Sequence, residues 1–361
     1  MIIKLFLFWR IGLLITTYLG SLIFPKIANN AIGAIGPGKS FNYWKSWAQW
    51  DGGHFLTIAQ NGYHFFTDYA FLPLYPFLVK SLNYLMGNVL LSGLVISSVC
   101  LLIFLLIFFR LIESKYNQKI AFFTIAAFML FPTSFFTVAF YSESLFLMLT
   151  GLCFYFLYKK NYLFAAIFCS FAALTRIVGI FLFISIIYTY FTQLNFNVKK
   201  LDRNIIFILI SPLPLIAYSI YLALNGQSSI IYLTSERFWA RGLTDPISTL
   251  ISYIWSIFTY PQSLNFYFDF TLTIFFLTVL FLGRGKIPSS MWIFSVLVIL
   301  AGISTGTLVS MPRYILASIG SFIILGKVFK DNIKLSTLIF SLSLIVQIIL
   351  ATLFISGYWV A

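Results

Sequence analysis

Charged residues are scarce in this 361-residue chain, where they make up 9% of the sequence and only nine are acidic. A water-soluble domain carries roughly a quarter charged residues, so this composition excludes an ordinary hydrated surface. Hydrophobic residues make up 61% of the chain and aromatic residues 20%. The protein is therefore expected to be embedded in a membrane.

Histidine and cysteine are also rare, with two and three residues. All three cysteines lie inside apolar runs and are predicted to be packing residues, not a disulfide framework or a metal site: Cys100, Cys153 and Cys169. Asp51, His54, His64 and Asp68 are close in sequence, but they include no Asp-X-Asp and their spacing matches no zinc pattern. We therefore expect no metal cofactor.

Apolar runs repeatedly reach the roughly 20 residues that a helix needs to cross a bilayer. We predict an all-α polytopic membrane protein, a single domain over residues 1–361, with roughly eleven transmembrane helices. An open sheet would leave backbone groups unpaired in lipid, and the runs do not alternate as barrel strands do. The predicted crossings are 3–24, 89–109, 120–138, 144–158, 162–174, 177–191, 205–224, 268–282, 291–308, 314–328 and 335–355. A long first loop, 25–88, follows the first crossing, and 247–260 is a candidate half-span.

The net charge of +14 could indicate nucleic acid binding, but the distribution of the basic residues favours a membrane. With the N-terminus inside, every basic pair or cluster falls in an inner loop, as the positive-inside rule requires. We therefore predict no nucleic acid partner, a cytoplasmic N-terminus and an extracytoplasmic first loop. Charges at membrane depth are candidate functional residues by default. The arginines that remain on the outer side are Arg176, Arg237, Arg241 and Arg313.

The stretch 44–63 holds the first acidic residue of the chain. Trp44, Trp47 and Trp50 recur every three residues, which predicts an amphipathic helix lying in the membrane interface. Asp51-Gly-Gly-His is typical of a helix start and Asn61-Gly62 of a helix stop. Asp51 could serve only as a helix cap, because aspartate is favoured there.

This stretch is one of four matches, in the same order, to a known family. The matching segments are Gln49–Tyr63 followed by Ala70–Pro76, Phe131–Phe136 with Tyr141–Phe146, Ala173–Gly179, and Pro312-Arg313-Tyr314. The sequence resembles the PIG-V family, the GPI mannosyltransferase II enzymes and their prokaryotic relatives, within the GT-C superfamily of membrane glycosyltransferases. Relatives often carry an acid a few residues after the Gly-Tyr pair. Here Phe65 and Phe66 follow His64, and Asp68 is the nearest acid.

The resemblance implies an inverting transfer of a sugar, mannose by the family name, from a polyprenyl-phosphate donor to an acceptor hydroxyl on the extracytoplasmic face of the membrane. A hydroxyl needs a general base, and inversion in one displacement needs only one carboxylate. Asp51 matches the position of the first-loop acid of GT-C enzymes and is the predicted base. His54, one helical turn later, is a candidate to orient Asp51 or bind a substrate hydroxyl, with a packing role as the alternative. Tyr63, in the same motif, is a further substrate-binding candidate, as is Asp68.

The leaving phosphate needs fixed cations, and the planar guanidinium suits phosphate best. Arg176 and Arg313 are the predicted phosphate contacts, beside Tyr314; the alternative is a buried ion pair, with Glu143 as one partner. Arg237 and Arg241, four residues apart, would share a helical face toward a phosphate or reach lipid headgroups. Glu143, at the start of a crossing, either stabilises the helix N-terminus or binds substrate hydroxyls.

The other class of function consistent with this sequence is a transporter or flippase of lipid-linked sugar. Transporters usually show repeated halves with broken helices at the midplane of the membrane. The sequence shows no such repeat, and its aromatic and acidic residues gather in one outer loop. We therefore favour the enzyme, acting on a glycolipid or glycan acceptor.

Overall fold

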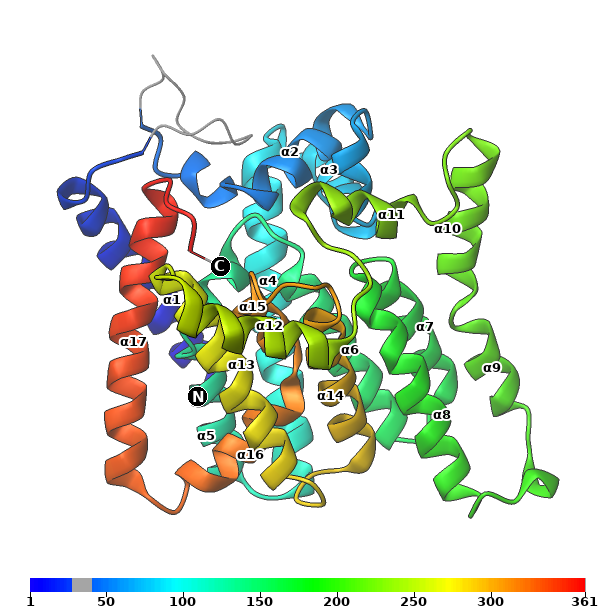
Figure 1. The fold of residues 1–361 in the computed structure, drawn as a ribbon. Coiled ribbons are helices and arrows are strands. Elements are labelled where there is room, and N and C mark those ends of the chain that lie inside the picture. Colours follow the sequence, from blue (N-terminus) through cyan, green and yellow to red (C-terminus); the bar gives the residue numbers. More distant parts are fainter. Residues whose placement is uncertain (28–40, 361) are drawn as a thin grey trace. The chain divides into compact units, whose positions relative to one another are not determined.

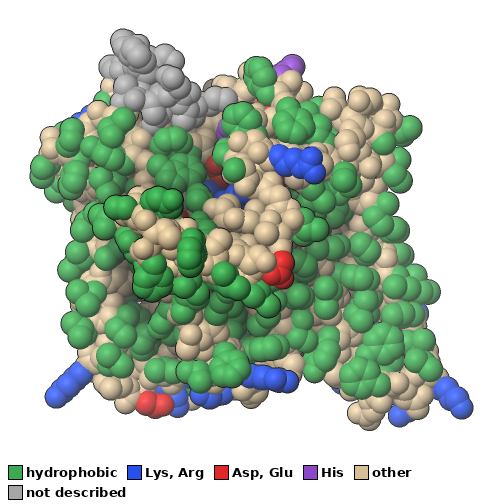
Figure 2. All heavy atoms as spheres, in the orientation of Figure 1, with side chains coloured by type: hydrophobic (Ala, Val, Ile, Leu, Met, Phe, Trp, Pro, Cys, Tyr) green, Lys and Arg blue, Asp and Glu red, His purple; other side chains and the backbone are tan. Residues whose placement is uncertain are grey.

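The computed structural model describes residues 1–27 and 41–360, and every regular element within them is a helix (Figure 1). The predicted all-α fold is confirmed. Part of the predicted first loop, residues 28–40, lies outside the described residues. The visible face carries mostly hydrophobic side chains (Figure 2), as expected of a protein that contacts lipid.

Five of the described helices are long and apolar enough to cross a membrane: Ile2–Ile23, Val89–Lys115, Asn204–Leu224, Leu264–Leu282 and Ile333–Ile355. A sixth span is obtained if the helix pair Met311–Ala317 and Ile319–Phe329 is counted as one. Shorter apolar helices accompany them, so the count of eleven crossings stays a prediction.

The described chain packs as two compact units. The first unit comprises residues 1–64, 73–148 and 325–361. Within it α1 and α17 lie side by side, and α4 packs against both α3 and α5 (Figure 1). Its helices are α1 (Ile2–Ile23), α2 (Asp51–Asn61), α3 (Leu74–Met86), α4 (Val89–Lys115), α5 (Gln118–Met129), the start of α6 (Glu143–Tyr158), the end of α16 (Ile319–Phe329) and α17 (Ile333–Ile355). The prediction of a single domain stays a prediction.

The second unit comprises residues 65–72 and 149–324. Within it α7 packs against α8 and α9, and α14 against α8, α13 and α15. Besides parts of α6 and α16, it holds α7 (Tyr162–Ala173), α8 (Phe181–Gln193), α9 (Asn204–Ile210), α10 (Leu213–Leu224), α11 (Ile231–Thr234), α12 (Pro246–Thr259), α13 (Leu264–Leu282), α14 (Ser289–Ile303) and α15 (Met311–Ala317). The predicted half-span 247–260 is thus the helix α12.

Asparagine side chains start several of the long helices. In each case the side-chain oxygen accepts a hydrogen bond from the backbone N–H three residues later, which satisfies a donor that the helix leaves open. These N-caps are Asn88 before α4, Asn117 before α5, Asn161 before α7 and Asn332 before α17. The cap residues set the boundaries of the apolar helices.

A buried glutamine joins three segments of the first unit. Gln347, fully buried in α17, accepts a hydrogen bond from the Trp9 Nε1 of α1 at 2.9 Å. Its amide nitrogen donates to the carbonyl oxygens of Met129 and Phe131, at 2.9 and 2.7 Å. The side chain is therefore satisfied at both ends and fixes α1 and α17 to the end of α5 and the residues just after it.

Two predictions about local structure are wrong. Residues 44–50 do not form an amphipathic interfacial helix; a four-residue 3₁₀ helix covers Lys45–Ala48, and Trp47 is fully buried. The three-residue spacing of the tryptophans fits a 3₁₀ turn better than an α-helix. The crossing predicted at 314–328 is not one helix, because α15 and α16 meet at 79° around Ser318, and whether the bent pair crosses stays a prediction.

Candidate functional site

Asp51 is the first residue of α2. The helix ends at Asn61 and is followed by Gly62, which has a positive φ. Both predicted helix boundaries are confirmed. Trp50, directly before Asp51, has φ 55° and ψ −121°, a conformation that costs a non-glycine residue free energy and is typical of functional sites. The strain therefore lies next to the predicted base.

The C-terminal segment of the first unit holds Trp50 in place. The Nε1 of Trp50 donates a hydrogen bond to the Tyr358 carbonyl oxygen at 3.3 Å. Its ring meets the Trp359 ring edge to face, with centroids 5.0 Å apart. These contacts offset the backbone strain and fix the direction in which α2 begins.

The segment before Asp51 also packs against the turn 140–141, which precedes α6. The Phe140 N–H donates to the Trp47 carbonyl oxygen at 2.9 Å, and the Tyr141 hydroxyl donates to the Gln49 carbonyl oxygen at 2.8 Å. At Gly52 an added Cβ would lie 3.1 Å from both the Phe140 carbonyl oxygen and the Tyr141 ring. Only glycine fits at position 52 without displacing these atoms. The motif that contains Asp51 therefore packs directly against the motif that begins at Tyr141.

Tyr75, from the Phe-Leu-Pro-Leu-Tyr-Pro motif, brings a third segment to this region. Its buried hydroxyl lies 3.0 Å from the Ser97 Oγ, and the Ser97 Oγ donates to the Tyr141 carbonyl oxygen at 3.1 Å. Burial raises the pKa of Tyr75 far above its ordinary value, and the charge of Glu143 raises it further. Tyr75 therefore stays a neutral hydroxyl near Glu143.

The remaining predicted residues of the first unit lie in or beside α2 and α6. Glu143 is the first residue of α6 and is only 3% exposed. His54 and Tyr63 are half-buried, His54 within α2 and Tyr63 just after its end. A separate hollow of about 470 Å³ borders α2 along Leu56 and Gln60, and neither Asp51 nor His54 lines it.

In the second unit, Arg176 lies in a tight turn after α7. Its backbone N–H donates to the Ala172 carbonyl oxygen at 3.0 Å, and its carbonyl oxygen accepts from the Gly179 N–H at 2.8 Å. A Cβ on Gly179 would come within 2.4 Å of the Ala172 backbone, so only glycine lets the turn fold onto α7. The Ala-Leu-Thr-Arg-Ile-Val-Gly motif thus positions the half-buried Arg176.

Tyr314, in α15, brings two of the predicted arginines together. The guanidinium carbons of Arg176 and Arg241 lie 5.9 and 5.8 Å from the centre of its ring, within the range of a cation–π interaction. Arg241 also donates to the Tyr314 hydroxyl at 3.1 Å. We call these three residues the arginine–tyrosine cluster.

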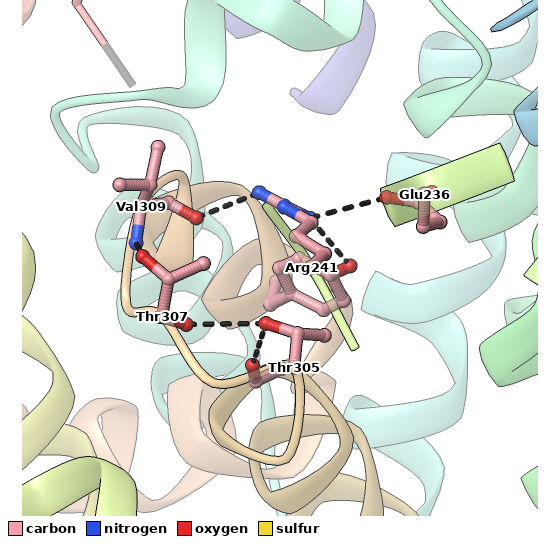
Figure 3. A network of polar contacts seen from close by, with 7 residues as sticks. Glu236, Arg241, Thr305, Thr307 and Val309 are labelled. Atoms are coloured by element: carbon pink, nitrogen blue, oxygen red, sulfur yellow. Dashed lines mark hydrogen bonds and ion pairs between the residues drawn. The ribbon is translucent and has the colours of Figure 1, made fainter. Parts of the chain in front are cut away.

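Arg241 is held from several sides (Figure 3). Its Nη2 donates to the Val309 carbonyl oxygen at 2.8 Å, and its Nη1 lies 3.9 Å from the Glu236 carboxylate. The chain that follows Arg241 is tied to the 304–309 loop, because the Gly242 and Thr244 N–H groups donate to the Thr305 and Ser304 carbonyl oxygens. Arg241 is thus a fixed cation.

Arg237 and Arg241 do not share a helical face, so that prediction is wrong. The 3₁₀ helix Ser235–Trp239 ends at Ala240, whose left-handed conformation turns the chain away before Arg241. Arg237 is exposed. Arg313 precedes Tyr314 in α15 and is only 8% exposed.

Asp68 caps a short helix. It is fully buried, and its Oδ2 accepts a hydrogen bond from the Phe65 N–H at 2.9 Å in a capping box of the 3₁₀ helix Phe66–Ala70. This cap explains an acid at this position. A substrate-binding role for Asp68 stays a prediction.

Arg10 is a charged residue that no sequence motif singles out. It lies within α1, and its guanidinium stacks over the Trp47 ring, 5.0 Å from the centroid. An arginine inside an apolar run is itself the signal that could have identified it. Across the described ranges 1–27 and 41–360, no cluster of three or more His, Cys, Asp or Glu residues could hold a metal ion.

Comparison with known proteins identifies the family of this chain. Residues 2–279 match the family described as Mannosyltransferase (PIG-V). Over 146 residues the chain is 32% identical to GPI mannosyltransferase 2 of Schizosaccharomyces pombe, a match that covers 38% of this chain and 30% of that enzyme.

The fold is similar to that of ArnT from Cupriavidus metallidurans, whose crystal structure is bound to undecaprenyl phosphate. The TM-score is 0.53 at 12% identity, over 90% of this chain and 60% of ArnT. This likeness confirms the expected all-α membrane fold. With a family match over most of its length, the chain belongs to the PIG-V mannosyltransferase family.

Proposed function

We propose that this protein is an inverting glycosyltransferase that moves mannose from a polyprenyl-phosphate donor to a hydroxyl of a glycolipid or glycan acceptor. The reaction takes place at the extracytoplasmic face of the cell membrane, with the N-terminus in the cytoplasm. Membership of the PIG-V family supports the sugar, and the undecaprenyl phosphate bound to ArnT supports the lipid carrier.

Asp51 is the general base in this proposal. Its carboxylate takes the proton of the acceptor hydroxyl as the hydroxyl oxygen bonds to the anomeric carbon of the sugar, and the bond from that carbon to the phosphate oxygen breaks. Attack from the face opposite the phosphate inverts the anomeric centre, and polyprenyl phosphate leaves. The observation that carries this role is the strained Trp50 directly before Asp51, held by Tyr358 and Trp359. His54, Tyr63 and Glu143 bind sugar hydroxyls.

The donor phosphate is bound by arginines of the second unit. Charge develops on the phosphate as the glycosidic bond breaks, and preorganised cations stabilise that charge most. Arg176 is the primary contact, because it is half-buried and is positioned by a tight turn and the Tyr314 ring. Arg313 is the second contact, and Arg241 supports Tyr314. Arg237, which is exposed, contacts lipid headgroups. No metal takes part in the proposed reaction.

The test separates transfer from transport. Purified protein is reconstituted in vesicles with radiolabelled polyprenyl-phosphate mannose and a lipid extract from the source cells. The proposal predicts label in a new, chromatographically distinct product, with the anomeric configuration opposite to that of the donor. Movement of intact donor between the leaflets, without a new product, would contradict it and support a flippase.

A further inference from the structure

Arg10 is a cation in α1, a helix that is apolar enough to cross a membrane. A charge in such a helix is costly unless it is paired or functional. No ion pair joins Arg10 to an acidic residue of the described ranges 1–27 and 41–360, and the sequence 28–40 contains no acid. The proposed reaction does not use Arg10 either, so the charge needs another explanation.

The guanidinium of Arg10 points into the first unit. It lies over the ring of Trp47, 5.0 Å from the centroid, and Trp47 is fully buried. Arg10 therefore does not extend along α1 toward lipid headgroups, as a snorkelling arginine does. Tyr43, in the same segment as Trp47, is fixed to α1, because its hydroxyl donates to the Leu14 carbonyl oxygen at 2.9 Å and lies 2.8 Å from the Thr17 Oγ1. The contact between Arg10 and Trp47 is thus part of a fixed packing.

Both members of this contact carry a buried donor without an acceptor. The Arg10 Nη1 and the Trp47 Nε1 make no hydrogen bond to any described residue. Buried donors are paired in the great majority of cases, so two exceptions on adjacent groups point to an acceptor from outside the chain. A water molecule would accept the hydrogen bonds but would supply no counter-charge. An anion does both.

A third unpaired group follows in the same segment. The side chain of Gln49 is fully buried, and neither its Oε1 nor its Nε2 makes a hydrogen bond to a described residue. The backbone here is fixed, because the Gln49 carbonyl oxygen accepts from the Tyr141 hydroxyl at 2.8 Å. Asp51 follows two residues later. Polar side chains without partners therefore gather in the segment that leads to the proposed base.

The surroundings of Arg10 indicate the class of anion. A guanidinium matches the geometry of phosphate oxygens, and anionic lipids present phosphate to basic residues at membranes. Leu7 and Ile11, which flank Arg10 on α1, are exposed and apolar, which suits a hydrocarbon chain. One arginine with one neutral N–H complements a single negative charge, as in a phosphodiester. A phosphate monoester carries up to about two charges at neutral pH and would bring an unbalanced charge into the site.

We propose that Arg10 and Trp47 bind the phosphodiester group of an anionic membrane lipid. The guanidinium and the indole N–H donate to its oxygens, and its acyl chain lies along the apolar face of α1. Bound there, the lipid fixes the segment 47–50 and with it the start of α2. Both residues belong to the first unit, whereas the proposed function assigns the donor phosphate to arginines of the second.

The test is lipid binding to the full chain in a neutral detergent, measured by native mass spectrometry. The probes are phosphatidylglycerol, which is anionic, and phosphatidylcholine, which is zwitterionic, with the same acyl chains. Wild type should bind phosphatidylglycerol about tenfold more tightly, because a charge-assisted contact is added. In Arg10→Gln this preference should fall below about threefold, and Arg10→Lys should retain part of it.

The control is Lys4→Gln, which removes the same charge from an exposed residue of the same helix. Its preference for phosphatidylglycerol should equal that of wild type. An unchanged preference in Arg10→Gln, or an equal loss in Lys4→Gln, would overturn the proposal.

Thermal unfolding in the same detergent separates a lipid site from a purely structural arginine. Without anionic lipid, Arg10→Gln should be at least as stable as wild type, because a neutral side chain is less costly to bury. Added phosphatidylglycerol should raise the unfolding midpoint of wild type more than that of the variant. A variant that unfolds at a lower temperature without lipid, yet gains as much as wild type when lipid is added, would make Arg10 a structural residue and contradict the proposal.

Polyprenyl phosphate, as a third probe, separates a membrane lipid from the substrate. Arg10→Gln should leave the binding of polyprenyl phosphate unchanged. If the variant loses binding of polyprenyl phosphate and keeps that of phosphatidylglycerol, the site takes the substrate and the proposal is wrong. None of these measurements needs sugar transfer, so a protein that transfers no sugar would refute the proposed function and leave this inference standing.

Discussion

The Trp50 and Trp359 rings meet edge to face with their centroids 5.0 Å apart, although the two residues are 309 positions apart in the sequence. Trp50 is the strained residue before Asp51, and Trp359 belongs to the C-terminal segment. The direction of the first turn of α2 therefore depends on the end of the chain.

Trp359→Ala should lower the rate of sugar transfer more than it lowers stability. Without the ring, Trp50 can relax and Asp51 shifts, and a misplacement of about 1 Å can cost roughly 10²-fold in rate. Transfer rates and thermal unfolding should be measured on the same preparation. Trp255→Ala, at a tryptophan that is 70% exposed, is the matched control and should change neither value. A Trp359→Ala protein with the wild-type rate would show that this contact does not position the base.

Gly52→Val should abolish transfer and destabilise the protein. A branched side chain at this position overlaps the Phe140 carbonyl oxygen and the Tyr141 ring, since even a Cβ would lie 3.1 Å from both. Overpacking of this kind costs typically about 1–3 kcal/mol. The denaturation midpoint and the rate of sugar transfer of the variant test this prediction. Gly12→Val is the control, because a Cβ there meets no atom within 4 Å. Equal effects at the two glycines would refute the argument from close packing.

Gln347→Leu should reduce the free energy of unfolding while leaving the KM for the donor unchanged. The substitution removes three hydrogen bonds and leaves Trp9 and two carbonyl groups unsatisfied. Such bonds contribute on average about 0.6 kcal/mol each inside membrane proteins, so a loss of about 2 kcal/mol is expected. Ser343→Ala, which removes one hydrogen bond to the Leu130 carbonyl oxygen, should cost about a third as much. Thermal unfolding of both variants in lipid measures the two losses of stability.

Arg176→Gln should raise the KM for the donor by about 10–100-fold, as expected for loss of a charge-assisted contact to phosphate. The control is Arg237→Gln, at an exposed arginine four residues before Arg241. It should change the KM for the donor less than about twofold. Both are measured as initial rates over a donor concentration series. If Arg237→Gln has the larger effect, the arginine–tyrosine cluster is not the phosphate site.

Much of the fold follows from the sequence because few patterns are compatible with lipid. Long apolar runs bounded by asparagines and lysines locate most helices to within a few residues, and the Asp51 and Asn61-Gly62 signals give both ends of α2. The break at Ser318 was not predictable from composition. Lys327 is the only charged residue in 314–328, and the 79° bend depends on how α15 packs against α13 and α14.

The candidate site was predictable where a motif fixes local structure, and less so where tertiary contacts decide. The turn that holds Arg176 follows from Gly179 in its own motif. The association of Arg176 and Arg241 on Tyr314 joins three segments, and no spacing in the sequence encodes it. Arg237 and Arg241 were wrongly paired because a four-residue spacing implies a shared face only if the helix continues, and Ala240 ends it.

The rate of the chemical step in Asp51→Asn decides whether Asp51 is the general base. Single-turnover transfer from radiolabelled polyprenyl-phosphate mannose is measured with wild type and with the variant, alongside the binding of donor to each. If Asp51 is the base, donor binding stays close to that of wild type and the transfer rate falls by about 10²-fold or more, the usual effect of losing a general base. Transfer at the wild-type rate would make Asp51 only the first residue of a helix and would contradict its role as the base.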